Sequence, residues 1–267
     1  MPGVVGSAAL IGIAEKGYLS LELSVEGPGG HSSMPHIPTQ IGRLSAAIAR
    51  LEAHQFPARL EAPTAEMLRD IMPVQAFGRR LVLANLWLFG PLVTRQLASS
   101  PEMATTVRTT IAPTIFNAGD TENVLPARAR AIVNFQILTG DTIEAVVARV
   151  NRTIADSSVK VALLPEGFAT SPSAVSDVTG PAFTAVAKAV QQTLGERPPL
   201  IVPFLTGPTD SRFWSKAKTR NVFRFTPFLY EKDWMSRAHG SNERISVQTL
   251  AAGVPFYSQL IRNAEAL

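Results

Sequence analysis

Hydrophobic and polar residues alternate strictly across residues 19–25, and this alternation constrains the fold more than any other feature of the sequence. A period of two puts every second side chain on the same face of a β-strand, so we predict a strand with one buried face. A glycine-rich turn at 27–30 ends this strand. Thr39 is then placed to cap a helix whose hydrophobic stripe predicts a buried side. The stripe comprises Ile41, Leu44, Ile48 and Leu51.

Three further strands and a second helix are predicted downstream. The strands cover residues 109–116, 130–137 and 159–164, and the helix lies between the last two, with Asp141 as its predicted N-cap. Residues 56–108 are rich in proline and hydrophobic side chains and are predicted to be an insertion of short helices. Without this insertion, the order strand, helix, strand, strand, helix, strand predicts a ferredoxin-like fold.

The most apolar part of the insertion, residues 81–93, is too short to span a membrane and is interrupted by Gly90 and Pro91. We therefore expect no membrane span. The pattern predicts a helix pair that is buried or that covers the neighbouring domain. Contact with a membrane surface is the alternative.

The last third of the sequence has a different pattern. A serine-rich linker at 171–177 precedes a predicted helix at 181–194. The continuous apolar runs 200–205 and 222–225 lack alternation, which is typical of strands in a sheet covered on both faces. A final helix is predicted at 247–264. This part of the chain therefore predicts an α/β arrangement.

The composition excludes several classes of protein. Charged residues make up 17% and hydrophobic residues 46%, which indicates a folded chain. The net charge of +4 is spread along the chain without a basic block, so we expect no nucleic-acid partner. The chain has no cysteine, which excludes disulfides and thiol catalysis. The first residues lack the basic segment of a signal peptide, and we expect a cytoplasmic protein.

Four polar segments lie where the backbone is predicted to turn. They are Gly30-His31-Ser32-Ser33-Met34-Pro35, Asn117-Ala118-Gly119 with Asn123-Val124-Leu125-Pro126, Thr209-Asp210-Ser211-Arg212-Phe213 and His239-Gly240-Ser241-Asn242-Glu243. In order and spacing this set resembles the zinc metallopeptidase and amidohydrolase family of carboxypeptidase S, carboxypeptidase G and aminoacylase. The likeness is greatest to the branch of carboxypeptidase S and fatty-acyl amino-acid synthase/hydrolase.

The resemblance implies how the chain is divided. Proteins of this family combine a catalytic domain that holds two zinc ions with an inserted ferredoxin-like lid that supports dimerisation. By position, residues 17–168 correspond to the lid/dimerisation domain, with the helical insertion at about 56–108. Residues 1–16 correspond to a strand of the catalytic domain, and residues 169–267 to its C-terminal portion. The expected fold class is therefore α/β with an α+β lid.

Four residues match functional positions of the family. His31 matches the lid histidine that donates a hydrogen bond to the tetrahedral oxyanion, frequently in a neighbouring subunit. Asn123 and Arg212 match residues that bind the carboxylate or carbonyl group of the substrate. His239 matches the last zinc ligand. Structural roles are also compatible with these residues, namely a glycine turn for His31, a backbone turn for Asn123, a salt bridge to Asp210 for Arg212 and a surface position for His239.

Most metal-binding residues of the family are absent from this sequence. No histidine is followed two positions later by aspartate, and no two glutamates are adjacent. A co-catalytic zinc pair needs several ligands, a bridging carboxylate and a general base, which His239 alone does not supply. We therefore expect zinc, implied by the resemblance, not to be bound stably by this chain alone. We also expect the upstream metal-binding half to be missing, and a homo-oligomer or a complementary chain that carries this half.

Three functions are compatible with these features. The resemblance favours a hydrolase that acts on the amide bonds of N-acyl amino acids or of peptides with a free carboxylate. The first alternative is a non-catalytic dimerisation or binding module. The second is a metal-independent, esterase-like hydrolase that uses Ser32 or Ser33 beside His31, although the sequence contains no Gly-x-Ser-x-Gly motif.

Overall fold

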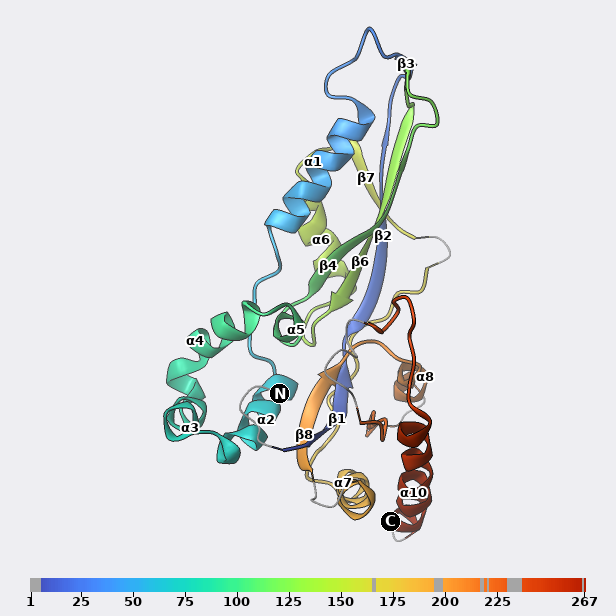
Figure 1. Cartoon of the computed structure of the whole chain (residues 1–267). Coiled ribbons are helices and arrows are strands. Elements are labelled where there is room, and N and C mark those ends of the chain that lie inside the picture. Colours follow the sequence, from blue (N-terminus) through green and yellow to red (C-terminus); the bar gives the residue numbers. More distant parts are fainter. Residues whose placement is uncertain are drawn as a thin grey trace.

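The ferredoxin-like sheet predicted for the first part of the chain is present in the structure. The computed structural model describes residues 6–164, 167–194, 199–216, 219, 221–229, 237–265 and 267. Four antiparallel strands form the sheet in the order β4-β6-β2-β7, which is the strand order of a ferredoxin-like fold (Figure 1). They are β2 (Gly17–Glu26), β4 (Thr110–Ala118), β6 (Arg128–Ile137) and β7 (Val159–Leu163).

Two helices, α1 (Gln40–Ala53) and α6 (Ile143–Ile154), cover one face of this sheet and enclose its hydrophobic core (Figure 1). In β2 and β6 every second residue points into this core, as the alternation predicts. These strand residues are Leu19, Leu21, Leu23, Val25, Ala129, Ala131, Val133, Phe135 and Ile137. The opposite face is polar, and there Arg130 of β6 forms an ion pair of 2.6 Å with Glu22 of β2.

The N-cap prediction is confirmed for α1 and wrong for α6. The Thr39 hydroxyl accepts a hydrogen bond of 3.1 Å from a backbone N–H in the first turn of α1. In α6 the N-cap is Thr142, whose hydroxyl accepts a hydrogen bond of 3.2 Å from the backbone N–H of Ala145. Asp141 does not cap this helix because its carboxylate accepts a hydrogen bond of 2.5 Å from the Thr109 hydroxyl.

A second sheet lies below the first in Figure 1, and in the described residues it consists of the parallel strands β1 (Ala8–Glu15) and β8 (Leu200–Thr206). The helices α7 (Pro181–Thr193) and α10 (Val247–Ala264) contribute to the hydrophobic cluster on one face, and α2 (Ala62–Ile71) contributes to the cluster on the other. Burial on both faces explains why the apolar run in β8 does not alternate.

The strand predicted at residues 222–225 is not formed. Arg224 makes only an isolated antiparallel bridge to Gly12 of β1. The backbone N–H of Val222 donates to the Ser176 hydroxyl, and this hydroxyl donates to the Val222 carbonyl oxygen, at 3.0 Å each. The Ser176 side chain therefore takes the hydrogen bonds that a neighbouring strand would make. Glycine is needed at position 12 because a Cβ there would lie 2.9 Å from the Arg224 Cβ.

The insertion forms helices as predicted, but its most apolar part is not buried. After α2, the chain forms α3 (Phe77–Ala84), α4 (Leu86–Ala98) and α5 (Pro101–Ala104). No residue of α3 is buried, and in α4 the buried residue is Thr94. Of the two predicted alternatives, a fully buried pair is wrong, because only one side of α3 and α4 packs on the hydrophobic cluster of α2 and β8. The two helices meet at 112° and project to one side of the molecule (Figure 1). Across the described ranges, no single helix is long and apolar enough to cross a membrane, and α3 and α4 meet this criterion only as a bent pair.

Candidate functional site

The tip of the ferredoxin-like unit brings two of the predicted site residues together. The short strands β3 (Gly30–His31) and β5 (Val124–Leu125) pair antiparallel, with His31 opposite Val124. Next to this pair, the backbone N–H of Ser32 donates to the carbonyl oxygen of Asn123 at 3.0 Å. His31 and Asn123 are therefore neighbours on adjacent segments, and both are exposed to solvent.

The His31 ring is oriented by the residue two positions downstream. The backbone N–H of Ser33 donates to His31 Nδ1 at 3.1 Å, and the Ser33 hydroxyl oxygen lies 2.9 Å from the same nitrogen. A backbone N–H can only donate, so Nδ1 is an acceptor and the neutral ring carries its proton on Nε2. The N–H that His31 can offer to a ligand is therefore at Nε2.

Arg212 lies in α8 (Ser211–Lys216), where two aromatic rings and an ion pair hold its guanidinium. Its Cζ is 4.4 Å from the centre of the Phe168 ring and 4.5 Å from the centre of the Phe213 ring. Its Nη1 donates to the carbonyl oxygen of Thr209 at 3.0 Å and lies 3.3 Å from the Asp210 carboxylate. The salt bridge to Asp210 is thus present. It does not exclude ligand binding, because the Asp210 side chain is 91% exposed and such pairs contribute little stability.

A buried polar cluster lies behind the loop of Arg212 and was not predicted from the sequence. Glu15, only 2% exposed, accepts hydrogen bonds from the backbone N–H and the hydroxyl of Thr209 and from the hydroxyl of Ser211. Its carboxylate also lies 3.4 Å from Nε of Arg224. The cluster therefore fixes the start of α8. One feature of the sequence could have indicated this cluster, namely the carboxylate of Glu15 at the end of an otherwise apolar strand.

Lys16, the next residue, is also buried, with 3% of its surface exposed. Its ammonium group donates to the carbonyl oxygens of Thr105 at 3.0 Å and Arg108 at 2.9 Å. It thereby joins the end of the helical insertion to the junction between the two sheets. Burial lowers the pKa of Lys16 to about 7, and the Asp141 carboxylate opposes this shift.

His239 lies in the loop before α10 with a left-handed backbone, φ 59°, and is exposed. Its backbone N–H donates to the Glu243 carboxylate at 3.2 Å. In the parts of the chain that the structure describes, no three His, Cys, Asp or Glu side chains are grouped so that they could hold a metal ion. These residues therefore do not fit a co-catalytic zinc pair, which needs several ligands.

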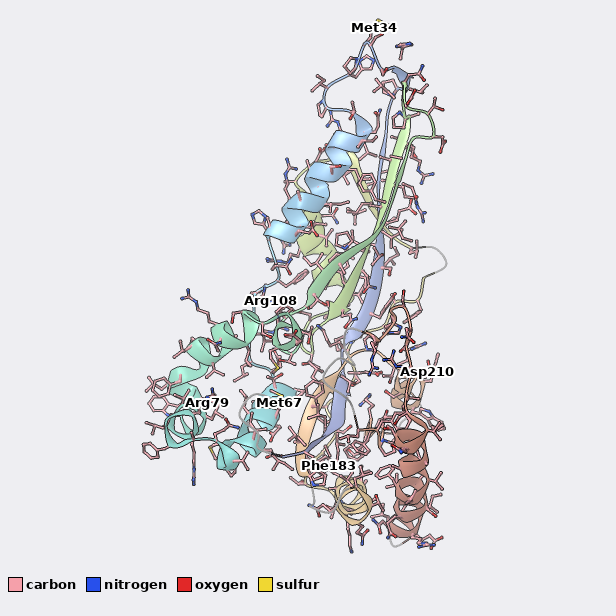
Figure 2. All side chains as sticks on the ribbon, in the orientation of Figure 1. Met34, Met67, Arg79, Arg108, Phe183 and Asp210 are labelled. Carbon is pink, nitrogen blue, oxygen red and sulfur yellow. The ribbon has the colours of Figure 1, made fainter. Side chains whose placement is uncertain are left out.

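The predicted site residues are not gathered in one place within a single copy of the chain. Figure 2 shows Met34, from the loop of His31, at the outer end of the ferredoxin-like unit. Asp210, the neighbour of Arg212, lies at the opposite end of this unit, beside the second sheet. The structure therefore brings His31 to Asn123 but does not bring this pair to Arg212.

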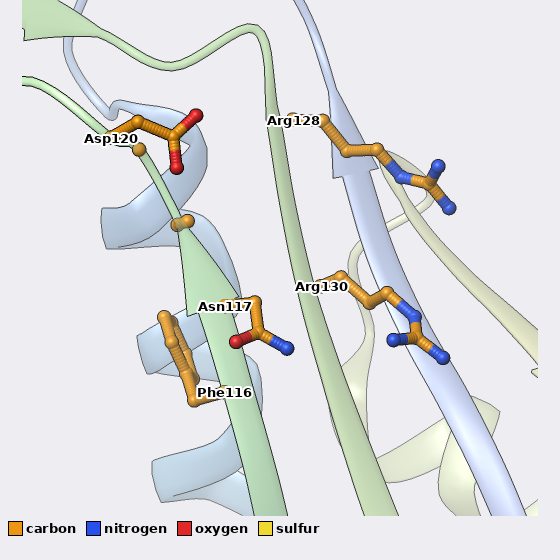
Figure 3. A pocket seen from close by; sticks show the side chains of 7 residues that line it. Phe116, Asn117, Asp120, Arg128 and Arg130 are labelled. Carbon is orange, nitrogen blue, oxygen red and sulfur yellow. The ribbon is translucent and has the colours of Figure 1, made fainter.

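A shallow depression on the ferredoxin-like sheet is a further candidate (Figure 3). Asn117 of β4 and Arg130 of β6 are register partners in its wall. Arg128 and Arg130 both pair with the Glu22 carboxylate, at 3.0 and 2.6 Å, and Arg128 also lies 3.8 Å from the Glu26 carboxylate, so the two positive charges face two carboxylates of the sheet. None of the four predicted site residues lines the depression, and we do not assign it as the site. Its lining comprises Phe116, Asn117, Ala118, Gly119, Asp120, Arg128 and Arg130.

Comparison with known sequences confirms the family that the sequence resembles. Residues 13–161 match the family described as the M20 peptidase dimerisation domain. The chain is 35% identical over 268 residues to the probable carboxypeptidase S-like 2 of Dictyostelium discoideum, which covers 99% of this chain and 50% of that protein. It is also 35% identical over 266 residues to the N-fatty-acyl-amino acid synthase/hydrolase PM20D1 of Homo sapiens, covering 99% of this chain and 53% of that protein.

Comparison with solved structures confirms the predicted α/β class. The M20 family metallo-carboxypeptidase Sso-CP2 from Sulfolobus solfataricus matches with a TM-score of 0.66 and 19% identity, over 97% of this chain and 61% of that chain. At this identity the likeness shows the fold alone. The chain spans about half the length of the curated relatives it matches. The family match, the relatives and the fold together show that this chain belongs to the M20 peptidase family and carries its peptidase dimerisation domain.

Proposed function

We propose that this protein is a hydrolase of M20 ancestry that acts on the amide bonds of N-acyl amino acids or of peptides with a free carboxylate. The names of its relatives, a carboxypeptidase S-like protein and an N-fatty-acyl-amino acid synthase/hydrolase, support this substrate class. The observation that carries the proposal is the pairing of β3 with β5, which places His31 beside Asn123. Amide hydrolysis requires a donor for the developing oxyanion, and the Nε2–H of His31 is such a donor.

Each predicted residue has a separate task in this proposal. His31 donates to the oxyanion, and Asn123 donates its side-chain amide to the substrate carbonyl or carboxylate. Arg212 binds the free carboxylate through its planar guanidinium. In one copy, Met34 of the tip and Asp210, the neighbour of Arg212, lie at opposite ends of the ferredoxin-like unit (Figure 2). We therefore propose a homodimer in which the tip of one subunit reaches the site of the other. The match to a dimerisation domain supports this arrangement.

The family implies a metal cofactor, typically zinc, whereas the described residues hold no group that fits it. We propose that His239 contributes one ligand and that a complementary segment or chain contributes the others. An apolar stripe on the exposed side of α10 supports this proposal, because its spacing suits contact with another element. The stripe comprises Val247, Leu250, Val254, Tyr257 and Ile261.

We also propose the division into domains that the sequence predicts. Residues 17–168 form the lid, with the helical insertion at about 56–108. Residues 1–16 and 169–267 form the part that corresponds to the catalytic domain. Two facts support this division: β1 pairs with β8, and the four strands of the lid sheet form their ladders with one another. An isolated bridge between Tyr18 of β2 and Thr170 connects this sheet to the segment that follows it.

Hydrolysis of an N-acyl amino acid by the purified protein, alone and with an added M20 catalytic half that supplies the missing ligands, tests the proposal. The assay is run with zinc and with a chelator, on wild type, His31→Ala and His36→Ala. His36 is an exposed histidine of the same loop and serves as the matched control. We expect His31→Ala to lower kcat by about 100- to 1,000-fold with little change in KM, as loss of an oxyanion donor does. Equal kcat values for the two variants would rule out the role of His31.

A non-catalytic dimerisation module is the second candidate. It is favoured by the absence of a three-ligand group among the described residues and by the match to a dimerisation domain. It predicts self-association without hydrolysis, with or without zinc, even when an M20 catalytic half is added. Light scattering together with the hydrolysis assay distinguishes it from the hydrolase.

One contact favours the metal-independent esterase as a third candidate. The Ser33 hydroxyl lies 2.9 Å from His31 Nδ1, which is within reach for a nucleophile and its base. In the described residues, however, the ring accepts the Ser33 N–H and has no hydrogen-bonded carboxylate to orient it. Ester hydrolysis that survives the chelator and is lost in Ser33→Ala would support this candidate.

A further inference from the structure

The bent helix pair α3 and α4 presents large hydrophobic side chains to solvent. Phe77 and Trp87 are each 82% exposed, and Leu81, Leu88 and Leu92 are between 51% and 61% exposed. We call these five residues the apolar arm. Single exposed leucines are common on protein surfaces, whereas a group of large apolar side chains on one projecting element indicates an interaction surface.

The orientation of the apolar arm is set by the other side of the same helices. Four of their side chains pack on the hydrophobic cluster that α2 shares with β8. They are Leu83, Leu86, Val93 and Leu97. Because these contacts anchor the pair, the apolar arm cannot turn inward without losing them. Figure 1 shows α3 and α4 projecting from the side of the molecule, away from the tip that carries β3.

The surface around the apolar arm is basic. Arg79, Arg80 and Arg95 are exposed on the same two helices, and Figure 2 shows the position of Arg79 at α3. Residues 71–101 contain no aspartate and no glutamate. Apolar side chains flanked by arginines, without acidic residues between them, are complementary to a phospholipid surface of negative charge.

We propose that the apolar arm docks on the surface of an anionic phospholipid membrane. Tryptophan and phenylalanine side chains insert at the boundary between headgroups and acyl chains, while arginine places its stem against lipid and its charge at the phosphates. The angle of 112° between α3 and α4 suits helices that lie on the surface.

A second copy of the chain fits the apolar arm less well than a membrane does. A symmetric contact through the arm would bring Arg79, Arg80 and Arg95 of both copies close together. Like charges in such a contact repel each other. No acidic residue in 71–101 is present to compensate them. Membrane docking is independent of the hydrolase activity proposed above.

Co-sedimentation with vesicles tests the proposal. One vesicle preparation is pure phosphatidylcholine, and the other contains about 30% phosphatidylserine. We expect wild type to bind the anionic vesicles at least about tenfold more tightly than the phosphatidylcholine vesicles. Binding to the anionic vesicles should weaken as salt is added. Phe77→Ser combined with Trp87→Ser should weaken binding to the anionic vesicles by about tenfold or more. Arg79→Gln combined with Arg80→Gln should weaken binding to the anionic vesicles by about fivefold per arginine. The preference for anionic over neutral vesicles should thereby be lost.

Matched controls separate the apolar arm from general surface effects. Ile37→Ser changes an 86% exposed hydrophobic residue in the lid loop. Arg152→Gln combined with Lys188→Gln removes two exposed cations outside the arm. Both controls should bind vesicles as wild type does. Circular dichroism melting verifies the fold of every variant.

A conservative variant provides a second measurement. Acyl chains carrying bromine should quench tryptophan fluorescence in wild type, and Trp87→Phe should lack the quenched component. The proposal is wrong if wild type does not bind anionic vesicles, or if Phe77→Ser with Trp87→Ser binds them equally well. If that double variant instead turns a dimer into a monomer and leaves vesicle binding unchanged, the apolar arm contacts a second copy and not a membrane.

Discussion

Glu15 and Thr209 meet across 194 positions of sequence, where the carboxylate accepts hydrogen bonds of 3.0 Å from the Thr209 backbone N–H and 2.8 Å from its hydroxyl. This contact joins the end of β1 to the loop that carries Arg212. Arg224 provides the buried counter-charge, with its side chain 7% exposed. The proposed carboxylate-binding residue is therefore positioned by a charge that lies in a different part of the chain.

Glu15→Gln is expected to destabilise the fold. The substitution preserves the size of the side chain but removes the charge that faces Arg224 in a buried pair. Loss of one partner of such a pair costs about 3–5 kcal/mol, measured as the free energy of unfolding in urea. Glu26→Gln, at a 53% exposed carboxylate with ion pairs of its own, is the control and should change stability by less than about 0.5 kcal/mol. If both variants lost the same free energy of unfolding, the buried ion pair of Glu15 would contribute no more to stability than an exposed one.

Stability should increase with pH because of Lys16. Burial lowers its pKa in the folded chain to about 7 from the ordinary value of 10.5. Between these two values the unfolded chain binds more protons than the folded chain, so the free energy of unfolding rises with pH. From about pH 7 to about pH 9 the gain is about 2 kcal/mol relative to Lys16→Met, which has no group to titrate here. The free energy of unfolding is measured in urea for both proteins at both pH values. If it changes with pH equally in wild type and in Lys16→Met, the lowered pKa of Lys16 is contradicted.

Arg212→Lys tests the role of the guanidinium in binding. Lysine cannot reproduce the planar fork that binds a carboxylate or the contacts with the Phe168 and Phe213 rings. We expect the Kd for an N-acyl amino acid, measured by calorimetry, to rise by about tenfold. Arg244→Lys, at an exposed arginine before α10, should leave the Kd unchanged. An unaltered Kd in Arg212→Lys would leave Arg212 with a structural role only.

Phe135→Ala probes the core of the ferredoxin-like unit. Phe135 is fully buried in β6, and its ring lies 6.3 Å from that of Phe56 in an edge-on arrangement. Removing a buried phenylalanine costs about 3–5 kcal/mol of unfolding free energy. Phe77→Ala, at an 82% exposed side chain, should cost less than about 0.5 kcal/mol. Denaturant titration of both variants provides the comparison, and equal losses would place Phe135 outside the core.

The ferredoxin-like unit could be predicted from the sequence because its signals are local. The alternation in residues 19–25 becomes β2, and Thr39 caps α1 as its position indicates. The order of strands and helices then leaves few ways to pair them. Where two local signals competed, the prediction was wrong: Asp141 was preferred as a cap, but its carboxylate contacts Thr109, and Thr142 caps α6.

Long-range contacts could not be predicted in the same way. Residues 222–225 have the composition of a strand, yet Ser176 takes the backbone groups of Val222 that a strand would use. For α3 and α4 the sequence predicts a pair that is buried or that covers the neighbouring domain, because hydrophobicity alone does not tell which side of a helix meets the core. Packing on the cluster of α2 and β8 decided this: Leu86 contacts the cluster, and Trp87 is left in solvent.

The sequence by itself determined the family, the order of the elements in the ferredoxin-like unit and the identity of His31, Asn123, Arg212 and His239 as candidates, because motifs and periodicity depend on neighbours in the chain. Only the tertiary structure decided which of them meet. His31 lies beside Asn123 because β3 pairs with β5, whereas Arg212 lies elsewhere, held by the cluster around Glu15. Such contacts join residues far apart in the chain, so they depend on how the elements pack and on no local pattern.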